Sequence, residues 1–196
     1  ESPALYLYEQ DFDLKGERKT RTGFMCGVKL EPYSLGNILP HEETLSKPKA
    51  DRLQLMRACH ANFSPVFGLY ADAEQIVNQA LIAARQNRPP DTEFTDDAGE
   101  THRLWVITDP KALNIVVEQM AQTPIFIADG HHRYETALSF SEEMAAPDYD
   151  RVLMTLVNLY DPGMLILPTH RLVKNVRNLD IDYFKEFNDS YGHMAG

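Results

Sequence analysis

The chain reads IFIADGHHRY over residues 125–134, an apolar run followed at once by a polar segment. The continuous apolar residues predict a buried strand over residues 125–128. Gly130 then permits a sharp turn or a positive φ. Small and apolar residues recur on one side of residues 132–145, which predicts a helix there. The fold is therefore expected to be organised around a strand–turn–helix element.

The segments on either side of this element carry a mixture of strand and helix patterns. Strands are expected at residues 4–9, 20–30, 66–70, 93–95, 102–107, 125–128, 152–159 and 164–167, and helices at residues 48–62, 72–86, 109–121, 132–145 and 180–187. Gly23 and Gly27 indicate a bulge or a close backbone approach in the second strand. The sequence predicts an α/β or α+β fold, with helices flanking a mixed sheet, in a single domain over residues 1–196.

The bulk composition restricts the classes of partner. The formal net charge of −10 and the pI near 5.1 argue against a protein that tracks a nucleic-acid backbone. No apolar run reaches the roughly 18 residues that a membrane-spanning helix needs. Only Cys26 and Cys59 occur, so we expect two reduced thiols in a cytoplasmic protein and no disulfide framework. The oligomeric state is left open.

The turn in residues 129–133 has the residue types of an anion site. The free N–H groups at the start of a helix point outward and favour negative charge. Arg133 offers a bidentate fork to phosphate oxygens, and His131 and His132 are further donors. Asp129 is suited to hold Mg²⁺ or to accept a proton from a substrate hydroxyl. The sequence therefore predicts a phosphate-binding turn.

Two other interpretations of the same residues remain open. In the first, Asp129 merely caps the helix and the histidines lie on the surface. Positive groups at a helix N-terminus oppose the macrodipole, however, and a bound anion would remove that conflict. In the second, His131 and Glu135, four residues apart on one helical face, bind zinc with a distant third ligand. No Cys pair or HExxH motif supplies further ligands, so no zinc is expected.

Four spaced motifs make the chain similar to the bacterial family known as domain of unknown function 1015. They are HEET at residues 41–44 followed by Lys49, Asp51 and Arg52, then NFSPVF at 62–67, ADGHHR at 128–133 and LPTHRL at 167–172. The likeness covers nearly the whole chain. It also implies that this chain is an internal piece of a longer protein, and that the missing segments could contribute to the site.

The turn by itself is similar to the phosphate-binding turn of the ParB/sulfiredoxin-like superfamily, and most closely to that of free-serine kinases. The resemblance implies a ParB/sulfiredoxin-like core. In those kinases the turn holds nucleotide phosphates, and an acidic residue from an earlier segment assists catalysis. By position, Glu42 corresponds to that acid and Asp129 is a second catalytic candidate. The phosphate-binding candidates are Gly130, His131, His132, Arg133 and His41, with Thr44, Arg52 and His170 as further candidates.

The resemblance and the residues together predict a nucleotide-binding phosphotransferase that uses ATP or ADP with Mg²⁺. Its acceptor is expected to be a small hydroxyl compound, with serine as one option. Phosphoryl transfer requires mainly positioning and charge stabilisation, which the turn is able to provide. One alternative is a nucleotide-responsive regulatory module without turnover. The other is a metal-dependent hydrolase that uses His131 and Glu135.

Overall fold

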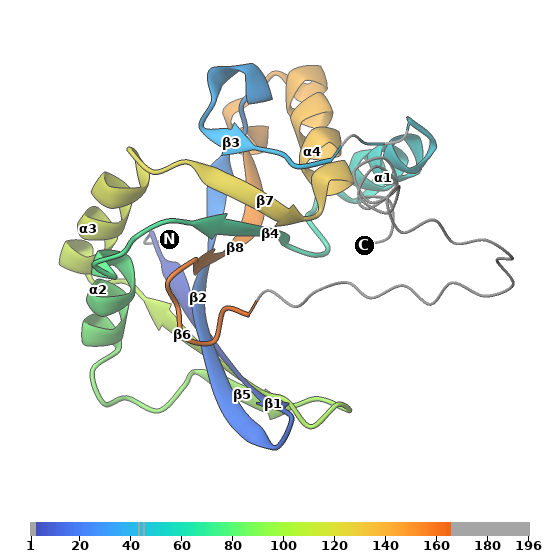
Figure 1. Cartoon of the computed structure of the whole chain (residues 1–196). Coiled ribbons are helices and arrows are strands. Elements are labelled where there is room, and N and C mark those ends of the chain that lie inside the picture. Colours follow the sequence, from blue (N-terminus) through green and yellow to red (C-terminus); the bar gives the residue numbers. More distant parts are fainter. Residues whose placement is uncertain (1–2, 43, 45, 166–196) are drawn as a thin grey trace, which may run out of the picture. The chain divides into compact units, whose positions relative to one another are not determined.

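Eight strands form one mixed sheet in the computed structural model, which describes residues 3–42, 44 and 46–165 (Figure 1). The strands are β1 (Leu5–Leu14), β2 (Glu17–Lys29), β3 (Ile38–Leu39), β4 (Val66–Tyr70), β5 (Thr92–Thr95), β6 (Thr101–Ile107), β7 (Ile125–Asp129) and β8 (Arg151–Asn158). Their order in the sheet is β3-β7-β4-β8-β2-β1-β6-β5. The chain divides into units at residues 1–164 and 165–196, and the description below concerns the first.

The described residues also form four α-helices and two short 3₁₀ turns. The helices are α1 (Ser46–Cys59), α2 (Ile76–Arg85), α3 (Pro110–Met120) and α4 (His131–Met144), and the turns are Tyr33–Leu35 and Pro147–Tyr149. None of these helices combines the length and apolarity needed to cross a bilayer. The mixed sheet with flanking helices confirms the predicted fold class.

Element boundaries differ from the sequence-based expectation mainly at helix and hairpin ends. The first hairpin is longer than expected because β1 and β2 stay paired as far as Leu14 and Glu17. Helix α2 begins later than predicted, yet the carboxylate of Asp72 still accepts a hydrogen bond from the amide of Val77 (2.9 Å). Met164 and Leu165 are not in a strand. The rest of the expected strand at 164–167, and the expected helix at 180–187, lie outside the described residues.

The pairing of β4 with β7 brings two of the sequence motifs together. These strands are antiparallel, and Phe67 at the start of β4 pairs with Asp129 at the end of β7. Strand β4 also pairs with β8 in parallel, while β2 pairs antiparallel with both β1 and β8. The NFSPVF segment therefore lies beside the turn that follows β7.

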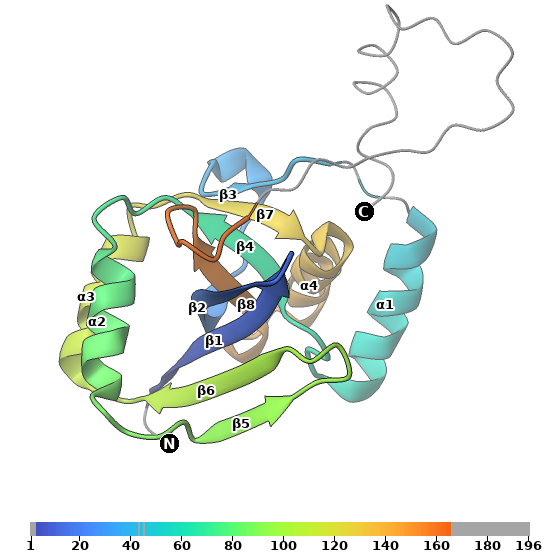
Figure 2. The same ribbon diagram turned by 60° about the horizontal axis from the view of Figure 1, so that its bottom comes forward.

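The helices lie in two pairs, α2 beside α3 and α1 beside α4 (Figure 2). One continuous core joins the sheet to α2, α3 and α4, and its fully buried members include Leu7, Val77, Tyr134 and Leu156. Helix α1 is largely exposed and is fixed to α4 by ion pairs such as Arg57–Glu143 (2.7 Å). Burial of the apolar core is the main stabilising contribution to this arrangement.

Replacing Gly23 with alanine is expected to destabilise the sheet. A Cβ there would lie 2.6 Å from the carbonyl oxygen of Leu156, which is backbone in the adjacent strand β8 and has little room to move. We expect the free energy of unfolding to fall by about 1–3 kcal/mol, measured by urea denaturation. Gly27→Ala is the matched control on the same strand, because its Cβ would meet only the Arg151 side chain at 3.4 Å. Equal stability of the two variants would contradict this account.

Candidate functional site

The turn after β7 is built around Gly130. This residue has φ 97° and precedes the first residue of α4, with Tyr134 N donating to its carbonyl (3.0 Å). A Cβ at Gly130 would lie 2.9 Å from the guanidinium of Arg133. Glycine is therefore favoured here by the left-handed backbone conformation, and a Cβ would also displace the flexible end of the Arg133 side chain.

The guanidinium of Arg133 folds back over the start of its own helix. It forms an ion pair with Asp129 (2.5 Å) and donates to Ser64 Oγ (3.0 Å) and to the carbonyl of Pro65. The Asp129 side chain is 72% exposed, so its carboxylate is free to change partners. The positive charge at the helix N-terminus, which the sequence interpretation assigned to a bound anion, is balanced in this structure by Asp129.

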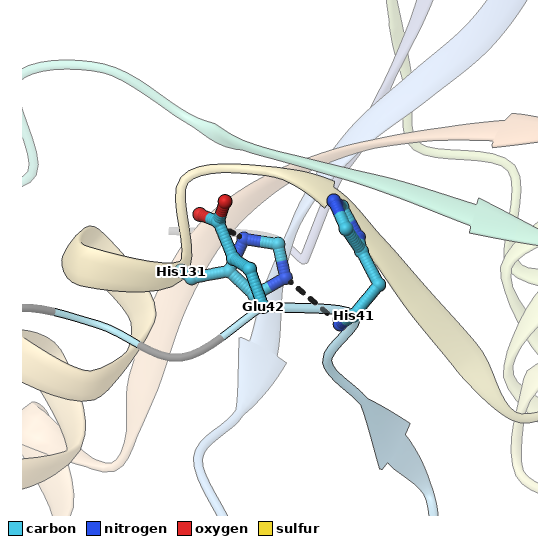
Figure 3. Close-up of side chains that lie close together, drawn as sticks. All are labelled: His41, Glu42 and His131. Carbon is cyan, nitrogen blue, oxygen red and sulfur yellow. Dashed lines mark hydrogen bonds and ion pairs between the residues drawn. The ribbon is translucent and has the colours of Figure 1, made fainter. Parts of the chain in front are cut away.

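His131 is buried, whereas the sequence predicted a donor to phosphate at the turn. Its side chain is 1% exposed, and its Nε2 accepts a hydrogen bond from the backbone N–H of His41 (3.2 Å). Its Nδ1 lies 3.0 Å from Oε1 of Glu42, and Figure 3 shows the ring between these two neighbours. Because Nε2 is an acceptor, the neutral ring carries its proton on Nδ1, facing the carboxylate. Nδ1 itself makes no hydrogen bond to the described residues, so His131 is an interior residue beside Glu42, not a donor exposed to phosphate.

The charge of His131 follows from its surroundings. Burial lowers its pKa below the ordinary value of 6.5, and the nearby His41 lowers it further. Glu42, Asp129 and Glu135 raise the pKa, but by less. The imidazole is therefore neutral at neutral pH, as the hydrogen bond from His41 also requires.

The lowered pKa of His131 predicts that stability falls with acidification. Below about pH 6.5 the unfolded chain binds a proton that the folded ring resists, so unfolding becomes more favourable as the pH decreases toward the folded pKa. The contribution is at most about 1.4 kcal/mol per pH unit. Urea denaturation between pH 7.5 and 5.5 should give a shallower pH slope for His131→Asn than for the unmodified protein. Equal slopes would contradict this assignment.

Glu135 is not paired with His131 as the zinc interpretation required. Its Oε2 accepts hydrogen bonds from Thr44 Oγ1 (2.5 Å) and Lys49 Nζ (2.8 Å). Burial alone would raise the pKa of Glu135, but these two donors bring it below its ordinary value. The carboxylate thus holds the start of α1 against α4. Thr44 donates to this carboxylate and not to a residue of the turn.

His41, Glu42 and His131 form a different group of possible metal ligands. One ligand atom from each lies within 4.8 Å of the others. The proton on Nδ1 of His131, however, removes the lone pair that would face Glu42 and a metal. His41 donates from its own Nδ1 to the carbonyl of Ile127 (2.8 Å). The hydrogen bonds of His131 Nε2 and His41 Nδ1 thus occupy ring nitrogens that a metal centre would need.

A cavity of about 150 Å³ lies between α1, α4 and the segment that connects α1 to β4. Arg52 and Arg133 both line it, together with exposed Phe63 and with Met56 and Asn62. Within the described part of the chain, Arg52 forms no ion pair and no side-chain hydrogen bond. Two guanidinium groups from different segments thus border one space that also has an aromatic side chain.

The predicted site residues fall into three groups. The first group lies together at the turn and consists of His41, Glu42, Asp129, Gly130, His131 and Arg133. Arg52 belongs with this group because it lines the same cavity as Arg133. His132 is half-buried, and its carbonyl accepts from Thr136 Oγ1 (2.6 Å). His170 lies outside the described residues.

The contact of Arg133 with Ser64 and Pro65 was not predicted from the sequence. The NFSPVF motif was recognised, but only the antiparallel pairing of β4 with β7 places it against the turn. Arg21 was not predicted as a candidate site residue; it is paired with Gln10 inside the first hairpin. The alternation of Arg21, Gly23 and Met25 along one face of β2 was the available signal.

Comparison with known proteins gives one result. A family described as "Protein of unknown function (DUF1015)" matches residues 1–193. A search of curated proteins found no match, and neither did a search of solved structures. The match extends over nearly the whole chain and includes every motif named above. The chain therefore belongs to the family of proteins of unknown function designated DUF1015.

Proposed function

We propose that this protein is a nucleotide-dependent phosphotransferase that acts on a small hydroxyl compound, with ATP or ADP bound at the turn before α4. The observation that carries the proposal is the cavity lined by both Arg52 and Arg133 at the start of that helix. Arginine pairs and helix N-termini are common phosphate-binding features in proteins. The likeness of the turn to the phosphate-binding turn of free-serine kinases, within the ParB/sulfiredoxin-like superfamily, also supports it.

The phosphates would bind over Gly130, where Arg133 already holds a carboxylate. Asp129 occupies the anion position in the absence of nucleotide, and its exposed side chain is able to swing out. Phosphate and Asp129 would repel each other at this distance, and bound Mg²⁺ would supply the positive charge that both require. The cavity of about 150 Å³ is too small for a whole nucleotide, so Arg52 and the Phe63 ring would contact only the part that enters it.

Glu42 is the proposed proton acceptor. One of its carboxylate oxygens lies 3.0 Å from Nδ1 of His131, and the Glu42 side chain is 28% exposed, so it is accessible from solvent. In the reaction the acceptor oxygen attacks the terminal phosphorus as the bond to the leaving phosphate oxygen breaks. The hydroxyl proton passes to Glu42, and ADP leaves when ATP is the donor.

Calorimetric titration with ATP and with ADP, each in Mg²⁺ and in EDTA, tests this function on the full protein. We expect micromolar binding in Mg²⁺ and binding at least tenfold weaker in EDTA. Release of ADP is then measured with a panel of small hydroxyl compounds. Binding without turnover on any acceptor would favour a regulatory nucleotide-binding module. Absence of binding to either nucleotide would overturn the proposal.

A further inference from the structure

A second hollow, of about 280 Å³, lies on the sheet and is formed by four adjacent strands, β4, β8, β2 and β1. Side chains alternate across a sheet, so Leu7 and Phe24 point into the core while Tyr8 and Met25 point to the opposite face. Met25, Phe67 and other apolar groups form most of the lining. The hollow is thus a surface feature separate from the core and from the cavity beside α1.

Arg21 provides the positive charge of this hollow. Its guanidinium donates to the carbonyl of Gly163 (3.3 Å) and to Oε1 of Gln10 (3.3 Å), and it stacks over the ring of Phe12 at 5.0 Å. Within the described part of the chain, no carboxylate lies at ion-pair distance from it. These neutral contacts orient the guanidinium without an ion pair to any described residue.

Asp161 is close enough for its pKa to be affected by Arg21, yet it is not a partner for it. Its Oδ1 accepts from the backbone N–H groups of Gly163 (2.9 Å) and Thr22 (3.3 Å). The Tyr8 hydroxyl, on the opposite side of the hollow, is also engaged, 2.6 Å from Nδ1 of His102. Arg21 is therefore the group of this hollow best suited to recognise a charged ligand.

The hollow is next to the turn in sequence and in space. Pro65 lines it, and the carbonyl of Pro65 accepts from Arg133. The preceding residue, Ser64, lines the cavity that contains Arg52 and Arg133. Phe67, also in the lining, pairs with Asp129 across β4 and β7. Ser64 thus borders the cavity, the next residue Pro65 borders the hollow, and Arg133 contacts both residues.

We propose that the hollow binds the phosphate acceptor and that Arg21 selects acceptors with a carboxylate group. This inference rests on the proposed function for the reaction, but the binding of a carboxylate by Arg21 does not depend on it. A guanidinium in a largely apolar hollow binds a carboxylate by two parallel hydrogen bonds, with little competition from water. The volume is below the roughly 300–1,000 Å³ of drug-sized ligand sites, so the occupant is small. With a carboxylate for Arg21 and a hydroxyl to accept phosphate, it is a small hydroxy acid.

Binding is measured without nucleotide, by NMR of the full protein labelled at its methionine methyl groups. Met25 lines the hollow, and its signal is assigned with Met25→Leu. The probes are glycerate and glycerol, which share hydroxyl groups and differ in the carboxylate. We expect glycerate to shift the Met25 signal in a saturable manner, and glycerol to bind at least tenfold more weakly. Arg21→Met should weaken glycerate binding at least tenfold, and Arg21→Lys by less.

Arg18→Met is the matched control, because Arg18 is an exposed arginine on the same strand that pairs with Asp11. It should bind glycerate as the unmodified protein does. Equal shifts with glycerate and glycerol, or unchanged glycerate binding in Arg21→Met, would overturn the inference. If Arg21→Met does not fold, Arg21→Lys and the comparison of the two probes on the unmodified protein still decide the question.

Nucleotide titration separates this inference from the proposed function. Arg21→Met should bind ATP with Mg²⁺ as the unmodified protein does, and its KM for a carboxylate acceptor should rise at least tenfold with little change in kcat. If the unmodified protein does not bind ATP but binds glycerate through Arg21, the phosphotransferase is rejected and the carboxylate site is kept. ATP-dependent turnover that is equally efficient with glycerol and glycerate would reject the role of Arg21 in selecting the acceptor and would leave the proposed phosphotransferase standing.

Discussion

Replacing Arg133 with methionine is expected to weaken the binding of ATP with Mg²⁺ by about 30- to 100-fold. A hydrogen-bonded charge pair of this kind contributes about 2–3 kcal/mol, and each 1.4 kcal/mol corresponds to tenfold in affinity. Methionine keeps most of the apolar length of the side chain but removes the guanidinium. Calorimetric titration of ATP in Mg²⁺ on both proteins measures the loss directly.

The Arg133→Met variant also loses the contacts with Asp129, Ser64 and Pro65, so its folding must be examined separately. Urea denaturation gives its free energy of unfolding. Arg57→Met is a suitable control, because Arg57 pairs with Glu143 on the exposed surface between α1 and α4. That variant should bind ATP normally. Unchanged ATP affinity in a folded Arg133→Met protein would remove the nucleotide from this turn.

Replacing Glu42 with glutamine is expected to reduce turnover by about 10²- to 10⁴-fold, the usual contribution of a positioned general base. Glutamine keeps the size and shape of the side chain beside His131, so the local structure should persist. The affinity for ATP should change little, because Glu42 is not proposed to contact the nucleotide. Release of ADP with the best acceptor gives the rate, and calorimetry gives the affinity.

Glu143→Gln is the control for Glu42→Gln, since it removes an exposed carboxylate of α4 that pairs with Arg57. It should turn over as the unmodified protein does. A Glu42→Gln protein with full activity would assign proton acceptance to another group, with Asp129 as the next candidate at the turn. A Glu42→Gln protein that loses nucleotide binding and turnover together would instead give Glu42 a role in shaping the site.

Local sequence patterns were sufficient for most elements of the fold. The continuous apolar run before Asp129 predicted β7, and the expected strand at residues 66–70 coincides with β4. A helix was expected from residue 109, and the carboxylate of Asp109 caps α3 by accepting from the amide of Ala112 (2.9 Å). These signals depend only on neighbouring residues, because caps and periodicity act within one or two turns of chain.

The position of His131 could not be obtained in the same way. Adjacent histidines at a helix start look equivalent in sequence, and either could face solvent. The fold buries one of them because the segment before α1 crosses the start of α4, which brings His41 N–H and Glu42 to opposite sides of the ring. The expected donor to phosphate thus becomes a buried residue beside a carboxylate.

The sequence by itself determined the elements, the mixed fold class and the motif at which the candidate site lies, since short-range periodicity and turn chemistry encode them. Only the tertiary structure decided which partners the motif residues have. Arg133 donates to Ser64, and Arg21 donates to the carbonyl of Gly163, through contacts between residues far apart in the chain. Such contacts follow from strand order and register, which are set by packing of the whole sheet and not by any single segment.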